Sequence, residues 1–263
     1  MPDTAAHHYF GQEVCKELRD DMRAFLAAHK SVFDLGLQGP DLLFYFRPFR
    51  SGNPVRDLGI GIHHQPALPR MQAAAETLRR KNDDTALAYL VGYACHWALD
   101  SAFHGDIARM APSSNEHFQL EAELDRQIIL SHYASNSLRF PRWRLTQTRL
   151  ARYDWLRVIY PELSQSECAE CAGSITYFMR LINAQTPLRL AAAAVVERLS
   201  GHPGMFRSAM VPRLPNMRFR AAAGQLYARL EGVTTRGVAA AEAVWACVQA
   251  GAPLPEFFQK DFE

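Results

Sequence analysis

The segment GYACHWALDSAFHGD at residues 92–106 decides how the chain folds, because it combines an apolar helical pattern with three regularly spaced polar side chains. His96, Asp100 and His104 are each four residues apart. On an α-helix, successive members of such a series turn by only about 40°, so all three lie on one stripe. A row of imidazoles and a carboxylate on an apolar helix is costly to bury without partners. Metal ions can supply the compensation, because zinc binds both histidine nitrogen and carboxylate oxygen.

The next helical segment, NEHFQLEAELD at residues 115–125, repeats the pattern. His117 and Glu121 stand four residues apart, and Asp125 continues the same stripe. An isolated pair of this kind is more often a hydrogen-bonded pair in the core, or an exposed pair, than a set of metal ligands. Two pairs on consecutive helices are typical of helical metal bundles, so together they favour a metal site.

Further candidate ligands lie upstream, because eight of the ten histidines fall within the first 117 residues. His7 and His8 lie in the first turn of an expected helix, and Asp41 follows a Gly-Pro turn. His63 and His64 end a stretch rich in glycine. The pattern does not choose between the two members of either histidine pair. The remaining histidines are interpreted as surface or turn residues: His29, His132 and His202.

Helical periodicity dominates the rest of the chain, and no stretch alternates β-branched and polar residues as a strand would. We therefore expect an all-α fold, a single helical-bundle domain over residues 1–263, with the metal motifs in 5–130 and a helical remainder in 135–263. A loop is expected at 52–61, ahead of His63. The expected helices span 5–29, 66–81, 85–110, 116–133, 145–160, 164–184, 187–200, 218–231 and 236–250.

The composition is that of an ordinary globular protein, with 48% hydrophobic and 21% charged residues. A formal net charge of +2 is too small to predict a nucleic-acid partner. No apolar run reaches the roughly 18 residues of a transmembrane segment. The N-terminus lacks the pattern of a signal peptide. Five cysteines without dense spacing indicate free thiols, so we expect a cytoplasmic protein.

The order of these motifs resembles the zinc-dependent phospholipase C family, whose fold is shared by the S1/P1-type nucleases. The family pattern is a histidine, an aspartate, a histidine, then HxxxD, a further histidine and HxxxE. Here it corresponds to HHYFG at 7–11, GPDLLFY at 39–45, IHHQ at 62–65 and the two helical segments quoted above. The resemblance covers roughly residues 5 to 130. It implies a helical bundle of the phospholipase C and P1 nuclease type that binds two or three zinc ions.

The resemblance also implies which residues hold each ion. The first zinc would be held by Asp41, His63, His96 and Asp100, and the second by His104, His117 and Glu121. The third would be held by His7 with a bridging Asp100. In secreted members the third zinc also uses a mature N-terminal tryptophan, whereas here Met1 precedes His7 by six residues. The spacing from Asp100 to His104 is also shorter than in the secreted bacterial enzymes.

The implied activity is zinc-dependent hydrolysis of a phosphodiester, most simply a phospholipid at a membrane surface. Asp41 is the best candidate general base, although it could serve only as a ligand. The arginine- and aromatic-rich segment 139–157 indicates either contact with a membrane or nucleic acid or, more simply, a solvated helix. The alternatives are an S1/P1-like nuclease, a phosphatase, or a non-catalytic helical protein that metal stabilises.

Overall fold

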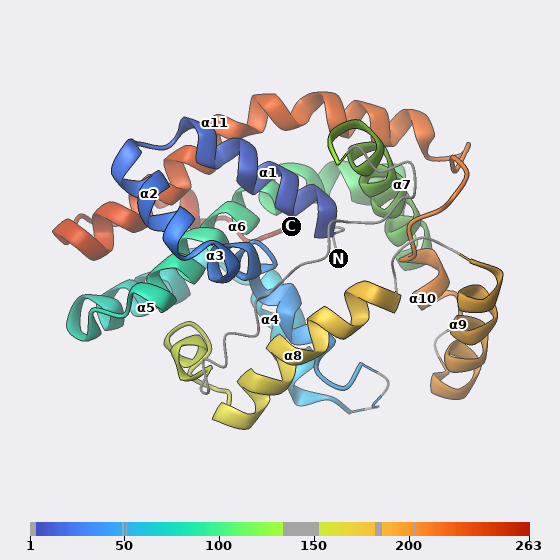
Figure 1. The fold of residues 1–263 in the computed structure, drawn as a ribbon, viewed down its shortest axis with the longest axis horizontal. Helices are drawn as coiled ribbons and strands as arrows, with labels where there is room; N and C mark the ends of the chain where they lie inside the picture. Colours follow the sequence, from blue (N-terminus) through green and yellow to red (C-terminus); the bar gives the residue numbers. More distant parts are fainter. Residues whose placement is uncertain (1–3, 49, 51, 134–152, 182–185, 202) are drawn as a thin grey trace.

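A computed structural model describes residues 4–48, 50, 52–133, 153–181, 186–201 and 203–263 (Figure 1). Every regular element in these ranges is a helix, which confirms the all-α prediction. Their bounds are α1 Thr4–Glu17, α2 Asp20–Ala28, α3 Lys30–Gly36, η1 Gly39–Tyr45, α4 Pro54–His63, α5 Ala67–Lys81, α6 Asp84–Met110, α7 Ser114–His132, η2 Asp154–Val158, α8 Gln165–Leu181, α9 Pro187–Ser200, α10 Met205–Ser208, α11 Arg220–Ala250 and η3 Glu256–Gln259.

Helix α6 forms the centre of the core and is the helix that the opening motif predicted. Its start is fixed by the Asp83 side chain, which accepts a hydrogen bond of 3.0 Å from the Ala86 amide. From Ala86 to Ser101 every side chain is buried, because helices α1, α3, α5, α7 and α11 all contact it. Figure 1 shows α1 and α11 crossing over α6. A helix surrounded in this way can present polar side chains only to a shared interior site.

Helices α3 and α6 approach each other closely enough for their backbones to touch. A Cβ added to Gly92 would lie 2.5 Å from the carbonyl oxygen of Phe33, and one added to Gly36 would lie 2.3 Å from that of Tyr89. Both distances are too short for a side chain, so glycine is required on each helix. This close packing fixes the loop after α3 against the polar stripe of α6.

The N-terminal region differs from the single helix expected over 5–29. Helix α1 ends at Glu17, and Arg19 adopts an extended conformation (φ −57°, ψ 153°) before α2 begins. Asp20 and Asp21 lie in the first turn of α2, where the helix dipole favours negative charge. The acidic pair therefore starts a new helix instead of continuing the old one.

The prediction of a loop at 52–61 is wrong, because Pro54–His63 forms helix α4. Asn53 caps this helix by accepting a hydrogen bond of 3.2 Å from the Arg56 amide, and Pro54 occupies the first turn. Gly59, which we interpreted as a loop residue, lies where a Cβ would be 3.1 Å from Leu43. The glycine permits close packing of α4 on η1 and does not make a turn.

Two expected helices, 218–231 and 236–250, are continuous as α11. The residues between the two expected helices, which include the β-branched pair Thr234 and Thr235, are helical too. The Thr234 hydroxyl donates to the Leu230 carbonyl within the helix. Half of the expected helix 145–160 lies outside the described ranges, and the described half, 153–160, contains the short 3₁₀ helix η2 and no α-helix.

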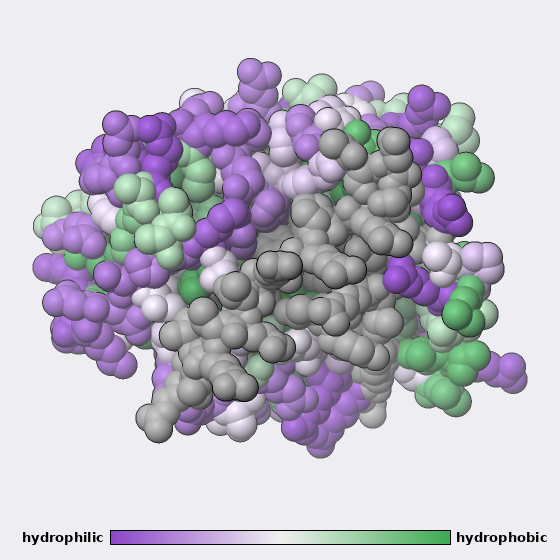
Figure 2. Space-filling view, in the orientation of Figure 1, coloured by the Kyte–Doolittle hydropathy of each residue, from purple (hydrophilic) through white to green (hydrophobic). Residues whose placement is uncertain are grey.

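The surface of α9 is unusually apolar (Figure 2). Leu188, Val195 and Leu199 are exposed by 81%, 59% and 83%. Their spacing places them along one side of the helix.

No helix in the described ranges is both long and apolar enough to cross a lipid bilayer. All five cysteines are free, as predicted.

Candidate metal centre

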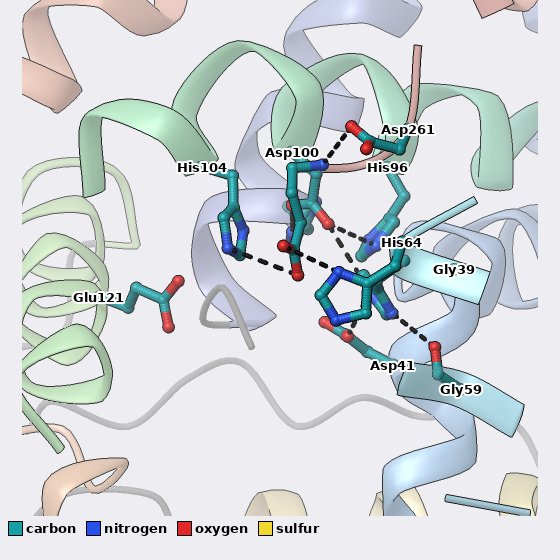
Figure 3. A network of polar contacts seen from close by, with 12 residues as sticks. Gly39, Asp41, Gly59, His64, His96, Asp100, His104, Glu121 and Asp261 are labelled. Atoms are coloured by element: carbon teal, nitrogen blue, oxygen red, sulfur yellow. Dashed lines mark hydrogen bonds and ion pairs between the residues drawn. The ribbon is translucent and has the colours of Figure 1, made fainter. Parts of the chain in front are cut away.

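Four helices bring histidines and carboxylates together in the interior. His7 comes from α1, Asp41 from η1, His63 from α4, and His96 and Asp100 from α6. All five side chains are buried. Figure 3 shows Asp41, His96 and Asp100 within one polar network. Residues separated by more than ninety positions therefore meet at one point.

Asp100 lies at the middle of this cluster and touches three imidazoles. Its Oδ1 is 3.1 Å from His7 Nε2, and its Oδ2 is 3.0 Å from His96 Nε2 and 3.9 Å from His63 Nε2. Asp41 contributes a second carboxylate, with Oδ1 3.1 Å from His63 Nε2. One carboxylate thus connects ligand candidates on three helices.

The donor atoms are close enough to share metal ions. Those of His7, Asp41 and His96 all lie within 4.8 Å of one another, and so do those of His63, His96 and Asp100. The rings of His7 and His96 are stacked with centroids 4.2 Å apart. The two groups share His96, so they form one cluster of donor atoms that could hold metal.

Two of the imidazoles are oriented by backbone carbonyls. His96 Nδ1 lies 3.1 Å from the Leu37 carbonyl oxygen, and His63 Nδ1 lies 2.7 Å from that of Gly59. A nitrogen that contacts a carbonyl must donate, which leaves Nε2 with its lone pair directed into the cluster. Metal-binding histidines are commonly oriented by such a bond.

Several buried atoms of the cluster make no hydrogen bond within the described ranges. A buried polar atom without a partner costs free energy, and a buried charge costs more. A divalent cation would satisfy them, and nitrogen and carboxylate oxygen are the donors that zinc accepts. The residues therefore fit zinc. The atoms are both nitrogens of His7, Asp41 Oδ1, His96 Nε2 and both carboxylate oxygens of Asp100.

A second cluster lies between α6 and α7. His117 Nε2 is 2.8 Å from Glu121 Oε1, and the rings of His104 and His117 have centroids 4.9 Å apart. Figure 3 shows the Glu121 carboxylate directed toward the side chains of His104 and Asp100. A small cavity lined by Asp100, His104 and Glu121 separates the two clusters. This cluster is more open than the first, because the side chains of His104 and His117 are partly exposed.

The structure distinguishes the paired histidines that the sequence left open. His8 Nδ1 lies 2.6 Å from the Tyr133 hydroxyl, and His64 is exposed with Nδ1 3.1 Å from Glu263 Oε2. Their neighbours His7 and His63 enter the buried cluster. His29 bonds its own helix through the Phe25 carbonyl and lies outside both clusters.

Electrostatics favours the protonation states that bind cations. Burial lowers the pKa of His7, and the neighbouring His96 lowers it further against the opposing effect of Asp100. Burial also lowers the pKa of His104. Burial acts to raise the pKa of Asp100, but its close contacts with His96 and His7 hold the pKa well below its usual range. A neutral His7 and an ionised Asp100 are the forms that bind cations, whereas Asp41 raises the pKa of His63 against the effect of burial.

Gly39 is a site residue that sequence reasoning missed, although it begins the GPD motif. It has φ +48°, and a Cβ there would lie 2.3 Å from the His96 ring. Its carbonyl oxygen accepts hydrogen bonds from the hydroxyls of Tyr89 at 3.0 Å and Tyr160 at 2.8 Å. Glycine at this position lets the loop carrying Asp41 lie directly against His96.

Asp125 continues the stripe of His117 and Glu121 but has a different partner. Its carboxylate accepts hydrogen bonds from the backbone amides of Ala5 at 2.8 Å and Ala6 at 2.7 Å. These amides belong to the first turn of α1. The amides of a first turn have no partner within the helix, and the side chain of the residue just before the helix usually accepts from them. Asp125 therefore caps α1 from α7 and fixes the helix that carries His7.

Replacing Asp125 with alanine is expected to lower the free energy of unfolding by about 2 kcal/mol, because two buried amides lose their acceptor. Denaturant unfolding of the metal-free protein measures this. Ser113→Ala removes the exposed cap of α7 and is the matched control, with a smaller expected loss. Equal losses in the two variants would show that the bonds from Asp125 add nothing to an ordinary cap.

An all-helical fold whose interior gathers histidines and carboxylates from four helices is that of a helical protein with residues that could hold a metal ion. The family model described as zinc-dependent phospholipase C matches residues 6–157, more than half of the chain. The chain belongs to the zinc-dependent phospholipase C family. No curated protein and no solved structure matches it.

Proposed function

We propose that this protein is a zinc-dependent phosphodiester hydrolase of the phospholipase C type, acting on a phospholipid or a related phosphodiester. The observation that carries the proposal is the contact of Asp100 with three buried imidazoles, at 3.0–3.9 Å. This arrangement fits two neighbouring cations better than one, and two cations are suited to clamp a phosphoryl group. Membership of the zinc-dependent family supports the same chemistry.

We assign the ligands as the resemblance implied. Asp41, His63, His96 and Asp100 would hold one zinc, and His104, His117 and Glu121 a second. His7 and a bridging Asp100 would hold a third. The contacts of His7 and His63 with the carboxylates support the choice of these histidines over His8 and His64. Zinc in such a site would bind phosphate oxygens, acidify water and stabilise negative charge.

Asp41 is the proposed general base. Burial acts to raise its pKa, but the close contact with His63 and the electrostatic effect of His96 lower it, so the carboxylate is ionised. An ionised carboxylate can accept the proton of an attacking water that lies within hydrogen-bond reach. His63 Nε2 lies 3.1 Å from this carboxylate. The same oxygen could instead serve only as a ligand.

A phospholipid is favoured over nucleic acid as the substrate. The exposed apolar side chains of α9 support contact with a lipid surface. The arginine- and aromatic-rich segment 139–157, which fits contact with either a membrane or nucleic acid, lies mostly outside the described ranges. The predicted products are diacylglycerol and a phosphorylated head group.

Hydrolysis of p-nitrophenylphosphorylcholine by the zinc-loaded protein, compared with hydrolysis of single-stranded DNA, tests the proposal. We expect cleavage of the choline ester, its loss on chelation and its return when zinc is restored. Preferential cleavage of DNA would favour the nuclease alternative. Failure to cleave either substrate or other phosphoesters would favour a metal-stabilised protein without catalysis.

We also propose that residues 1–263 form one helical domain in the cytoplasm. Contacts of α11 with α1, α5, α6 and α7 support the single domain, because they join the C-terminal half to the metal-binding half. The five free thiols support a reducing compartment.

A further inference from the structure

The segment that follows α11 returns to the metal centre and is firmly anchored there. Phe258 and Phe262 are fully buried. The Trp97 indole nitrogen donates to the Lys260 carbonyl at 3.1 Å, and the Phe262 amide donates to the His63 carbonyl at 3.2 Å. This segment, residues 256–263, therefore forms part of the wall of the site.

The Phe262 ring lies directly behind the proposed ligands. Its centroid is 5.3 Å from that of His63 and 5.9 Å from that of His96. On its other side it meets Tyr93 edge to face, with centroids 5.6 Å apart. The ring fixes the next residue, Glu263, at the edge of the cluster.

The Glu263 carboxylate lies between two histidines. Its Oε1 is 3.7 Å from His104 Nε2, and its Oε2 is 3.1 Å from His64 Nδ1. The side chain is 34% exposed, so this carboxylate is positioned at the mouth of the site and not in its interior. The Glu263 amide donates to Asp261 Oδ1 at 3.2 Å, which holds the backbone in place.

We propose that Glu263 is a further ligand of the second zinc, beside His104, His117 and Glu121. The inference rests on the proposed assignment of those three residues to one ion. It adds a residue from the far end of the chain, outside the range that the family model matches.

Geometry supports this assignment. Two ligands at about 2.0–2.2 Å from a tetrahedral zinc lie roughly 3.3–3.6 Å apart. The 3.7 Å between His104 Nε2 and Glu263 Oε1 is close to that separation without movement of the backbone. The other carboxylate oxygen is held by His64, as the outer oxygen of a metal-binding carboxylate commonly is.

Charge balance supports it as well. The first proposed zinc has two carboxylate ligands, Asp41 and Asp100, whereas the second has only Glu121. A doubly charged ion beside one carboxylate and two neutral imidazoles keeps a net positive charge, which is unfavourable in a largely buried site. Glu263 would neutralise it.

The assignment has a consequence for substrate binding. Four protein ligands fill a tetrahedral zinc, whereas catalytic zinc keeps an open position. Glu263 is the most exposed of the four proposed ligands, so its carboxylate is the one that a phosphate oxygen would replace.

The test is Glu263→Gln, with Glu256→Gln as the matched control on the same segment, where Glu256 is exposed. Zinc affinity is measured by chelator competition, and the cobalt(II)-substituted protein is followed by its visible absorption. We expect Glu263→Gln to weaken one zinc by at least about tenfold and to change the cobalt spectrum. The control should match the wild type.

Wild-type zinc affinity and an unchanged cobalt spectrum in Glu263→Gln would overturn the inference, and so would an equal loss in both variants. Thermal unfolding of the metal-free variants shows whether either substitution disturbs the fold. The metal measurements do not depend on hydrolysis. If the wild type cleaves no phosphoester while Glu263→Gln still loses zinc, the ligand is retained and the proposed function fails.

Discussion

Replacing Asp100 with alanine is expected to remove more zinc than any other single substitution in the protein. This carboxylate contacts His7, His96 and His63, so its loss would remove a ligand from two proposed ions together. It would also leave buried imidazoles facing cations without their counter-charge. We expect the zinc affinity to fall by at least about 100-fold, the upper end of the loss seen when only a supporting group is removed.

Metal analysis after gel filtration measures the effect, and His29→Ala is the control. The His29 ring bonds to the carbonyl of Phe25 at the end of α2, away from the proposed ligands, so its removal should leave the metal content unchanged. Equal metal retention in the two variants would refute the bridging role of Asp100. Asp100→Asn, which preserves the volume of the side chain, separates the loss of charge from the effect of a cavity.

The substitution Asp41→Asn is expected to reduce kcat by about 10²–10⁴-fold while much of the zinc remains bound. The amide oxygen can still contact a cation, but the amide cannot accept a proton from water. Steady-state kinetics on p-nitrophenylphosphorylcholine, with zinc content measured on the same samples, tests this. Asp57→Asn changes an exposed aspartate near the start of α4 and should have no effect.

The outcome separates the two roles that Asp41 could have. A large loss of kcat with retained zinc assigns it as the general base. A loss of activity in proportion to lost zinc, restored by excess zinc, would instead assign it as a ligand alone.

The sequence predicted best those parts of the site that depend on a single helix. His96, Asp100 and His104 share a stripe because of helical geometry alone, and α6 differs from the expected span 85–110 by one residue. The pair His117 and Glu121 is equally local, and their 2.8 Å contact follows from the four-residue spacing.

Choices that depend on packing between helices could not be made from the sequence. His7 and His8 are adjacent, so on a helix they point about 100° apart, and only the placement of α1 against α6 decides which one enters the cluster. Asp125 caps α1 from another helix, across 119 residues of sequence from Ala6. No local pattern distinguishes such a cap from a ligand.

Glycine does not reliably mark a loop in this sequence. Gly59 and Gly61 resemble loop residues, yet both lie within α4. For Gly59 the reason is the close contact with η1, which is a property of the folded packing. The extent of α4 matters for the site because this helix carries His63.

The shared acceptor at Gly39 has a consequence for how the protein opens. The hydroxyls of Tyr89 and Tyr160 both bond this one carbonyl and lie 2.8 Å from each other, which joins η1 to α6 and to the segment after η2. Backbone amides of η1 should therefore exchange with deuterium only when the surrounding core unfolds as a unit, at the slow rate set by global stability. The loop that carries Asp41 would then behave as part of the cooperative core and not as a mobile edge of the site.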